Sequence, residues 1–416
     1  MNILIIPSWY PWSGHPLRGI FFREQAMLLG RTRPGWNIAV AVWGQRRFML
    51  SLRNPFKSAG VLIDFLRCQA AKKERRLLPN VIEYHRPTIE WTRRLGRGNL
   101  KGMVRAGRKI LIRARRDFGH LDLIHAHVSF PGGWIAMELG RRFRLPYVIT
   151  EHMGNFPADE FLNTDGSLRE IIAHPLGHAR AIVAVSPVLA DRLSRSGFPV
   201  SCIIPNMVDE DFYKPATRGR APGPGGRTGP GFIFFSLSSF KPAKGIGDLL
   251  QALAGLIDRL SEKEKKRVEL RIGGEGDEEK NLRALAAHLE IDPWVRWLGR
   301  LNRNQVLEEY QRCDCFVLAS HRESFSIVLL EAAACGKPVI ATRCGGPEKL
   351  VTIENGMLVD PGNPDGLALA MQTMLRQGKK FKAAEIRKQF LQRFSKNKVA
   401  GLIEKLYRDA TRKKPA

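Results

Sequence analysis

Two short apolar segments between residues 313 and 360 constrain the fold more than any other feature of this chain. They cover residues 315–319 and 338–342, and each ends at polar residues or glycine. Continuous apolar runs of this length are typical of strands that are buried on both faces of a parallel sheet. Between them, residues 325–335 carry apolar side chains at helical spacing. This order of strand, helix and strand predicts an α/β domain with a doubly wound sheet.

Two glutamates stand where such a sheet binds ligands. Glu323 follows the first apolar run, and Glu331 lies inside the predicted helix. Ligands of open parallel sheets bind beyond the carboxyl ends of the strands. A carboxylate there can accept hydrogen bonds from the vicinal hydroxyls of a sugar, each worth roughly 1.5–3 kcal/mol. Solvated or ion-paired acids occur at the same spacing, so the two glutamates alone do not identify a site.

The residues around the glutamates favour a binding site. The first amides of the predicted helix, at Phe325, Ser326 and Ile327, are expected to be unpaired and to face the loop, where they suit an anion. After the second strand, residues 345 and 346 are both glycine, which permits a tight turn, and Pro347 suits the first position of another helix.

This block resembles the donor-binding signature of retaining glycosyltransferases of family 4, which have the GT-B fold. In that family a glutamate, seven residues and a second glutamate precede Gly-Lys-Pro-Val-Ile-Ala and then Gly-Gly. Glu323, Glu331, residues 336–338 and residues 345–346 match this pattern in order and spacing. The resemblance implies two Rossmann-like domains that face a central cleft, with the nucleotide sugar mainly on the second domain and the acceptor mainly on the first.

The resemblance also implies a role for each matching residue. Glu331 would hold the ribose of the donor nucleotide, and Glu323 would act at the hydroxyls of the transferred sugar. The amides near Phe325 and Ser326 would meet the diphosphate or the sugar. The family loop usually reads Glu-Gly-Phe-Gly, whereas residues 323–326 read Glu-Ser-Phe-Ser, so the conformational freedom of two glycines is lost.

Lys244 is the expected cation of the site. It follows the first predicted strand of the second half and precedes Gly245. A cation there would neutralise a departing diphosphate without a metal, and this role is the one that the family motif implies. Relatives commonly have an arginine five residues earlier, where this chain has Ser239, and Lys241 is a candidate replacement. Outside that motif, a lysine in a loop is most often simply solvated.

Two residues of the first half are also expected at the site. The segment Asp-Leu-Ile-His-Ala-His resembles a family segment whose second histidine faces the sugar, which implies a catalytic role for His127 and a structural one for His125. Gly19 matches a glycine loop that approaches the donor phosphates or the acceptor in relatives, although the usual second glycine is absent. Trp9 and Tyr10 are candidates for stacking on an acceptor sugar, with packing in the loop or core as the alternative.

The length of 416 residues is sufficient for two ordinary domains. We expect an N-terminal acceptor-side domain over residues 1–206 and a nucleotide-sugar-binding domain over residues 232–389. Residues 214–231 are dense in glycine and proline and predict a linker or loop. By resemblance, a C-terminal helix at about residues 390–416 would pack back on the first domain.

The formal net charge of +27 is large, and much of it lies between residues 67 and 116. Residues 104–118 combine basic side chains with an apolar strip at residues 110–112. A basic helix with such a strip suits an anionic membrane surface. A plainly solvated helix is the alternative, and a nucleic-acid patch is the least favoured reading because no nucleic-acid-binding motif accompanies the charge.

No apolar run approaches the roughly 18–20 residues that span a bilayer. The six scattered cysteines fit a reducing compartment, so we expect a cytoplasmic protein, with attachment to the inner face of the cell membrane as a further option. A metal site is not expected, because neither Cys313 and Cys315 with His321 nor His125 with His127 shows a complete ligand set.

The sequence therefore predicts a retaining, metal-independent hexosyltransferase without a cofactor. It would move a sugar from a nucleoside diphosphate sugar to an acceptor hydroxyl, and a lipid-linked or cell-surface glycan precursor is a candidate acceptor. Two other classes remain open: a nucleotide-sugar epimerase on the same scaffold, and a basic non-enzymatic protein that binds nucleic acid or membranes. The sequence does not choose among uridine, guanosine and adenosine donors.

Overall fold

The chain forms two compact units in a computed structural model. The structure describes residues 1–412 except 13, 16–17, 46, 51–54, 72, 92–97, 155 and 217–230, and it leaves out the side chains of residues 55, 57 and 379. Unit 1 consists of Met1–Met207 and Lys396–Ala416, and unit 2 of Val208–Ser395. Most of the predicted linker lies outside the described residues. The C-terminal part of unit 1 begins at residue 396 and not near residue 390.

Unit 1 is built on an eight-stranded sheet in the order β3-β4-β2-β1-β5-β6-β7-β8. Its strands are β1 (Asn2–Pro7), β2 (Asn37–Val42), β3 (Glu74–Leu78), β4 (Val81–His85), β5 (Leu123–His127), β6 (Tyr147–Glu151), β7 (Ala181–Ala184) and β8 (Cys202–Ile203). Neighbouring strands are parallel except β3 and β4. Apolar runs in the sequence predict strands at residues 2–7, 38–43, 123–126, 147–150 and 181–185, and each is confirmed to within about a residue. Strands β3 and β4 were not predicted, because their charged sequences contain no apolar run.

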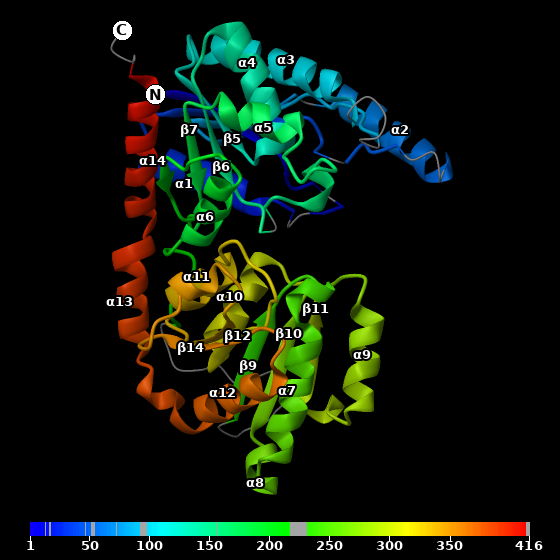
Figure 1. The fold of residues 1–416 in the computed structure, drawn as a ribbon, viewed down its shortest axis with the longest axis vertical. Coiled ribbons are helices and arrows are strands. Elements are labelled where there is room, and N and C mark those ends of the chain that lie inside the picture. The colour runs from blue at the N-terminus through cyan, green and yellow to red at the C-terminus, as the bar shows by residue number, and fades with distance from the viewer. Residues whose placement is uncertain are drawn as a thin grey trace. The chain divides into compact units, whose positions relative to one another are not determined.

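Helices cover both faces of this sheet (Figure 1). They are α1 (Ile20–Thr32), α2 (Pro55–Ala70), α3 (Leu100–Phe118), α4 (Trp134–Phe143), α5 (Glu170–Gly177), α6 (Pro187–Arg195) and α14 (Lys396–Thr411), with short helical turns at Ser129–Gly133 and Asp159–Phe161. Helices α1 and α14 share one apolar core with the sheet, in which Leu29 and Tyr407 are fully buried beside Ile3 and Ile38. This core makes α14 part of unit 1.

Helix α3 contains the basic helix expected at residues 104–118. Most of its apolar strip packs in the core, whereas the prediction placed the strip against a membrane surface. Ile110 and Leu111 are fully buried in unit 1, and only Ile112 is exposed. The buried part of the strip packs in the core and is not available to a membrane surface. None of the helices in the described part of the chain is long and apolar enough to cross a bilayer.

Unit 2 contains a six-stranded parallel sheet in the order β11-β10-β9-β12-β13-β14. Its strands are β9 (Phe232–Leu237), β10 (Val268–Gly273), β11 (Val295–Gly299), β12 (Cys315–Leu318), β13 (Val339–Thr342) and β14 (Gly356–Val359). Its helices are α7 (Ile246–Asp258), α8 (Glu262–Lys265), α9 (Glu279–His288), α10 (Arg303–Arg312), α11 (Ile327–Ala334), α12 (Pro364–Gln377) and α13 (Ala383–Phe394), with 3-10 turns at Pro242–Lys244, Asp292–Trp294, Pro347–Lys349 and Gly378–Lys380. Helices α7 and α12 lie side by side on one face of the sheet (Figure 1). Both units are doubly wound α/β domains, as predicted.

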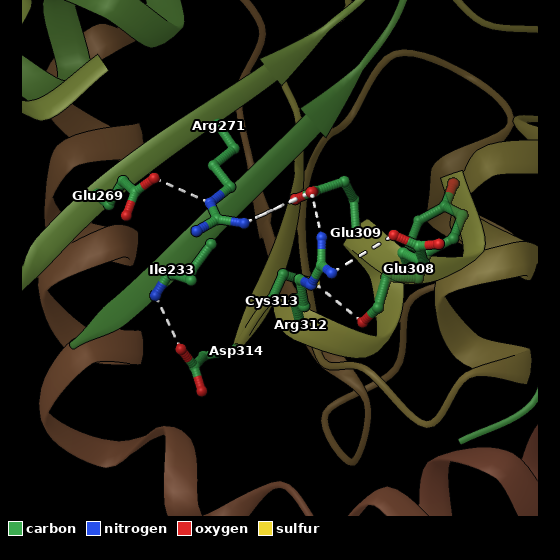
Figure 2. Close-up of polar contacts among 9 residues, drawn as sticks. Ile233, Glu269, Arg271, Glu308, Glu309, Arg312, Cys313 and Asp314 are labelled. Atoms are coloured by element: carbon green, nitrogen blue, oxygen red, sulfur yellow. Dashed lines mark hydrogen bonds and ion pairs between the residues drawn. The ribbon is translucent and has the colours of Figure 1, made fainter. Parts of the chain in front are cut away.

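A buried ion-pair network joins α10 to the sheet of unit 2 (Figure 2). Arg271 on β10 is 4% exposed, and its guanidinium lies 2.9 Å from a carboxylate oxygen of Glu269 and 3.1 Å from one of Glu309. Arg312, one turn further along α10, also contacts Glu309. Tyr310, which follows Glu309 on α10, is fully buried among the rings of Phe235 and Phe316. The network therefore fixes the position of a helix that reaches the predicted site.

Candidate active site

Two loops of unit 2 meet at the carboxyl ends of β12 and β13. The backbone N–H of Glu323 donates to the carbonyl of Cys344 at 3.0 Å, and the N–H of Gly346 donates back to the carbonyl of Glu323 at 3.1 Å. These bonds hold the first predicted glutamate beside the predicted diglycine turn, at the edge of the sheet where parallel folds bind ligands.

Lys244 and Glu323, which are 79 residues apart in sequence, form an ion pair. The Lys244 Nζ donates to the Glu323 Oε1 at 2.6 Å, and the Ser320 hydroxyl donates to the same oxygen at 2.9 Å. Both side chains are partly buried. Gly245, which follows the lysine, has a φ of +61°, and an added Cβ would lie 1.9 Å from the Ala319 carbonyl oxygen. Only glycine permits this close approach, which brings the lysine to the end of β12.

The start of α11 differs from the prediction. The helix begins at Ile327, so Phe325 and Ser326 precede it, and the unpaired amides of the first turn start at residue 327. The predicted start at residue 325 is wrong because Ser326 has a φ of +83°, which is not a helical angle. Ser326 is 7% exposed, and its hydroxyl has no hydrogen-bond partner in the described structure. An orphaned buried hydroxyl beside unpaired amides suits a polar ligand.

The diglycine turn packs directly on this segment. A Cβ added to Gly346 would lie 2.5 Å from the backbone of Phe325. The N–H of Gly345 donates to both carboxylate oxygens of Glu348 at 2.9 Å. The turn thus presses against the backbone of the loop, which explains why a side chain is not tolerated at position 346.

Glu331 lies on the buried side of α11. It is 8% exposed, and the Tyr310 hydroxyl donates to its Oε2 at 3.0 Å. Burial raises the pKa of Tyr310, and the negative charge of Glu331 raises it further, so the tyrosine remains a proton donor. Tyr310 was missed in the sequence, where a single tyrosine gives no signal.

His127 lies at the end of β5 in unit 1 and is fully buried. Its Nδ1 is 3.0 Å from the Nε2 of His152, and its Nε2 has no hydrogen-bond partner among the described residues. Burial lowers the pKa of His127 well below its usual value, and the neighbouring histidines lower it further, so the ring is neutral. The free nitrogen of a neutral imidazole can donate one hydrogen bond to a hydroxyl or accept one from it, depending on the tautomer.

His125 and Glu151 have structural partners. The two ring nitrogens of His125 lie 2.6 Å from the Tyr407 hydroxyl and 2.7 Å from the Thr150 hydroxyl. The Glu151 carboxylate accepts from the Ser129 hydroxyl at 2.7 Å and from the backbone amides of residues 129, 152 and 153. His125 thus joins β5 to β6 and α14, and Glu151 holds the loops that follow β5 and β6.

Gly19 precedes the first turn of α1 and has a φ of +64°. A Cβ at this position would lie 2.7 Å from the Trp9 carbonyl oxygen. The ring of Phe22, in the first turn of α1, is 4.7 Å from that of His127, so the glycine turn and the histidine adjoin. Tyr10 is 2% exposed, so it packs in the core and does not present its ring for stacking.

A cavity of about 280 Å³ opens at the carboxyl ends of β2 and β4 in unit 1. Its basic lining residues are Arg23, Arg47, Arg75 and His85, and its apolar ones include Trp12 and Phe48. The one carboxylate in the lining, Glu83, accepts from the Tyr10 hydroxyl at 2.7 Å and pairs with Arg23 at 3.0 Å. The cavity has an excess of positive charge and suits an anionic ligand.

Unit 2 thus brings Lys244, Glu323, Phe325 and Ser326 into one loop cluster, with Glu331 on the helix that follows it. Gly19 and His127 belong to unit 1. Among the described residues, no group of three His, Cys, Asp or Glu side chains is placed to hold a metal ion.

Two family models match the chain, glycosyl transferases group 1 over residues 222–393 and glycosyltransferase family 4 over residues 42–212. The chain is 28% identical over 302 residues to N-acetyl-alpha-D-glucosaminyl L-malate synthase from Bacillus anthracis, covering 70% of this chain and 76% of that protein. Its fold is similar to that of sucrose-phosphate synthase from Thermosynechococcus elongatus, with a TM-score of 0.73 and 19% identity over 98% of both chains. Anabaena HepE in complex with UDP matches with a TM-score of 0.68 and 20% identity over 98% of this chain and 99% of that one. The chain is a GT-B glycosyltransferase and belongs to the group 1 glycosyltransferases of the family 4 type.

Proposed function

We propose that this glycosyltransferase transfers a hexose from a nucleoside diphosphate sugar to an acceptor hydroxyl, with retention at the anomeric carbon and without a metal. The observation that carries the proposal is the Lys244–Glu323 ion pair, which stands beside the orphaned hydroxyl of Ser326 and the free amides of α11. These groups combine a cation, a helix terminus and a sugar-binding carboxylate in one loop cluster.

In this proposal the donor diphosphate lies at the start of α11. The unpaired amides of the first turn and the Lys244 ammonium balance the negative charge that grows on the leaving diphosphate. Phe325 and Ser326 offer backbone amides next to the helix, and the Ser326 hydroxyl adds a further hydrogen bond. Glu323 accepts from hydroxyls of the transferred sugar, while Lys244 holds that carboxylate in place before the donor binds.

Glu331 is proposed to bind the ribose of the nucleotide. Tyr310 donates to one of its carboxylate oxygens and so orients the group. The nucleotide is proposed to be UDP, because HepE, which has the same fold, binds UDP in its solved structure. His127 and the turn at Gly19 would act on the sugar and the acceptor side, through the free Nε2 of the histidine.

The acceptor is proposed to bind in the basic cavity of unit 1. Arg23, Arg47 and Arg75 line it, and guanidinium groups bind phosphate and carboxylate groups well. A lipid-linked glycan precursor carries such phosphates. The Bacillus anthracis relative is named for a product that contains L-malate, which is also an anion.

Calorimetric titration with UDP, GDP and ADP in EDTA tests the donor site. We expect saturable binding of UDP that weakens by about 10-fold or more in Glu331→Ala, because the hydrogen bonds of a charged acceptor to the ribose are lost. Glu262→Ala, which removes an exposed carboxylate on α8, is the matched control and should bind as the wild type does. If none of the three nucleotides binds, the transferase proposal fails.

The role of Lys244 is tested by turnover. Lys244→Ala should lower the rate of sugar transfer by about 10²–10³-fold, because a charge that stabilises the leaving group is removed. Lys263→Ala, which removes an exposed lysine on α8, is the control and should transfer sugar at the wild-type rate. Lys241→Ala is compared as well, and a loss as large as that of Lys244→Ala would assign the missing arginine charge to Lys241. Donor sugar that is converted without any acceptor would instead identify an epimerase.

A further inference from the structure

Helix α2 is weakly attached to the rest of unit 1. In Figure 1 it extends away from the sheet, and it packs closely against none of the other described helices or strands. Its contacts include the ion pair between Arg47 and Asp64 at 2.8 Å and the edge-on rings of Phe48 and Phe65 at 5.5 Å. Both contacts lie on one side of the helix, and large apolar side chains on the opposite side are 40–90% exposed.

The opposite side of α2 is apolar. Phe56 is 90% exposed, Ile63 53% and Leu66 65%, and Leu62 beside them is 40% exposed. Spacings of seven and three residues place Phe56, Ile63 and Leu66 on one stripe of a helix. Four of the ten exposed large apolar side chains in the described part of the chain are on this helix. Such a concentration marks an interaction surface.

Basic residues accompany the stripe on α2 and follow the end of the helix. Arg67 is exposed on the helix itself, and the exposed Lys73 and Arg76 come after it, next to and on β3. The nearby acids are neutralised, since Asp64 pairs with Arg47 and Glu74 pairs with Arg113 at 2.8 Å. A second copy of this chain would bring the same basic residues against them. A partner with an apolar interior and an anionic surface is complementary to both features.

The other side of α2 and the segment that follows it line the basic cavity of unit 1, through Cys68 and Ala71. An α-helix with its side chains is about 10–12 Å across, so a surface bound to the stripe lies within about one helix diameter of the cavity.

We propose that α2 docks this protein on an anionic lipid bilayer. The stripe of Phe56, Leu62, Ile63 and Leu66 enters the interface, and the basic residues around it contact the headgroups. The cavity then lies within about one helix diameter of the membrane surface, from which the phosphate of a lipid-linked acceptor would enter it. The docking goes beyond the transfer reaction and does not depend on it, whereas the assignment of a lipid-linked acceptor rests on the proposed function.

Sedimentation of the full chain with vesicles tests the docking. Phosphatidylcholine vesicles are compared with vesicles that contain phosphatidylglycerol, at low and high salt. We expect binding to the anionic vesicles that weakens with salt and falls by about 10-fold or more in the double variant Ile63→Asp with Leu66→Asp, because apolar side chains in the interface are replaced by charges that the anionic surface repels. The double variant Ile353→Asp with Leu369→Asp is the matched control, since it changes the same residue types at exposed positions of unit 2 and adds the same charge.

The proposal fails if the wild type binds no vesicles, or if the two double variants bind vesicles equally. It also fails if the wild type self-associates through α2 and does not bind lipid. UDP titration of the same samples separates this question from the proposed function. A variant that loses vesicle binding but keeps both UDP affinity and the thermal unfolding profile of the wild type supports docking through α2. An altered unfolding profile indicates that unit 1 is misfolded and shifts the test to Phe56→Ser, which changes the most exposed side chain.

Discussion

Ser326 has a backbone φ of +83° immediately before α11, in a region that favours glycine. A non-glycine residue in such a conformation costs of order 1–3 kcal/mol and persists only when its surroundings hold it. Here Gly346 packs against the backbone of the preceding Phe325 and fixes the loop. The strain and the orphaned hydroxyl of Ser326 occur together where the donor is proposed to bind, which is the usual place for stored strain.

The buried histidines of unit 1 predict a loss of stability in acid. Burial lowers the pKa of His125 to about 3, below its ordinary value of about 6.5. As the pH falls below about 6.5, His125 binds a proton in the unfolded chain but stays neutral in the folded chain. The free energy of unfolding therefore decreases down to about pH 3, by up to about 1.4 kcal/mol per pH unit. Denaturation by urea at pH 7.5 and 5.5 measures this decrease.

His125→Gln should reduce that decrease by about 1.4 kcal/mol at pH 5.5, because one titrating group is removed while glutamine can still bond to Tyr407 and Thr150. Burial raises the pKa of Glu151, which acts in the opposite direction but equally in both proteins. Equal decreases in wild type and variant would contradict a neutral buried His125.

Helix α10 illustrates how an element is positioned by charges that the sequence does not reveal. Arg271→Ala removes the partner of buried Glu309 on the sheet and leaves only Arg312 among the described residues, at 3.5 Å, and breaking a buried ion pair costs up to about 3–5 kcal/mol. We expect a loss of stability of this size on chemical denaturation, together with weaker UDP binding, because Tyr310 next to Glu309 orients Glu331. The exposed pair of Arg283 and Glu279 on α9 provides the control, and Arg283→Ala should cost less than about 1 kcal/mol. Similar losses in the two variants would show that α10 is held by other contacts.

Continuous apolar runs predict strands at residues 2–7 and 232–237, which are the observed bounds of β1 and β9. No such run marks β3 or β4, and β4 contains Glu83, which is buried and charged. Its burial is tolerated only because Tyr10 and Arg23, which are distant in sequence, satisfy the carboxylate. A sequence pattern shows burial of apolar side chains directly, but it does not show which polar side chains acquire partners.

At the scale of the whole molecule, the stability of unit 1 depends on the C-terminal residues 396–416, whereas that of unit 2 does not. Unit 1 shares its core with α14, in which Val399, Ala400 and Tyr407 are fully buried. Removal of residues 396–416 should therefore expose the core of unit 1 and lower its thermal unfolding temperature. Residues 208–395 contain Lys244, Glu323 and Glu331 and should fold and bind UDP by themselves. A chain of residues 1–395 that unfolds at the same temperature as the full chain would contradict this division.

The sequence by itself determined the doubly wound fold class and most strand positions, and it singled out Glu323, Glu331 and Lys244 as the predicted donor-site residues. Periodicity and motif spacing are local properties, so they survive without coordinates. Only the tertiary structure decided that Lys244 meets Glu323, that Tyr310 bonds to Glu331 and that the strip on α3 is buried while the stripe on α2 is exposed. These features depend on contacts between residues far apart in the chain, and packing against the rest of the molecule selects which face of an amphipathic helix remains in solvent.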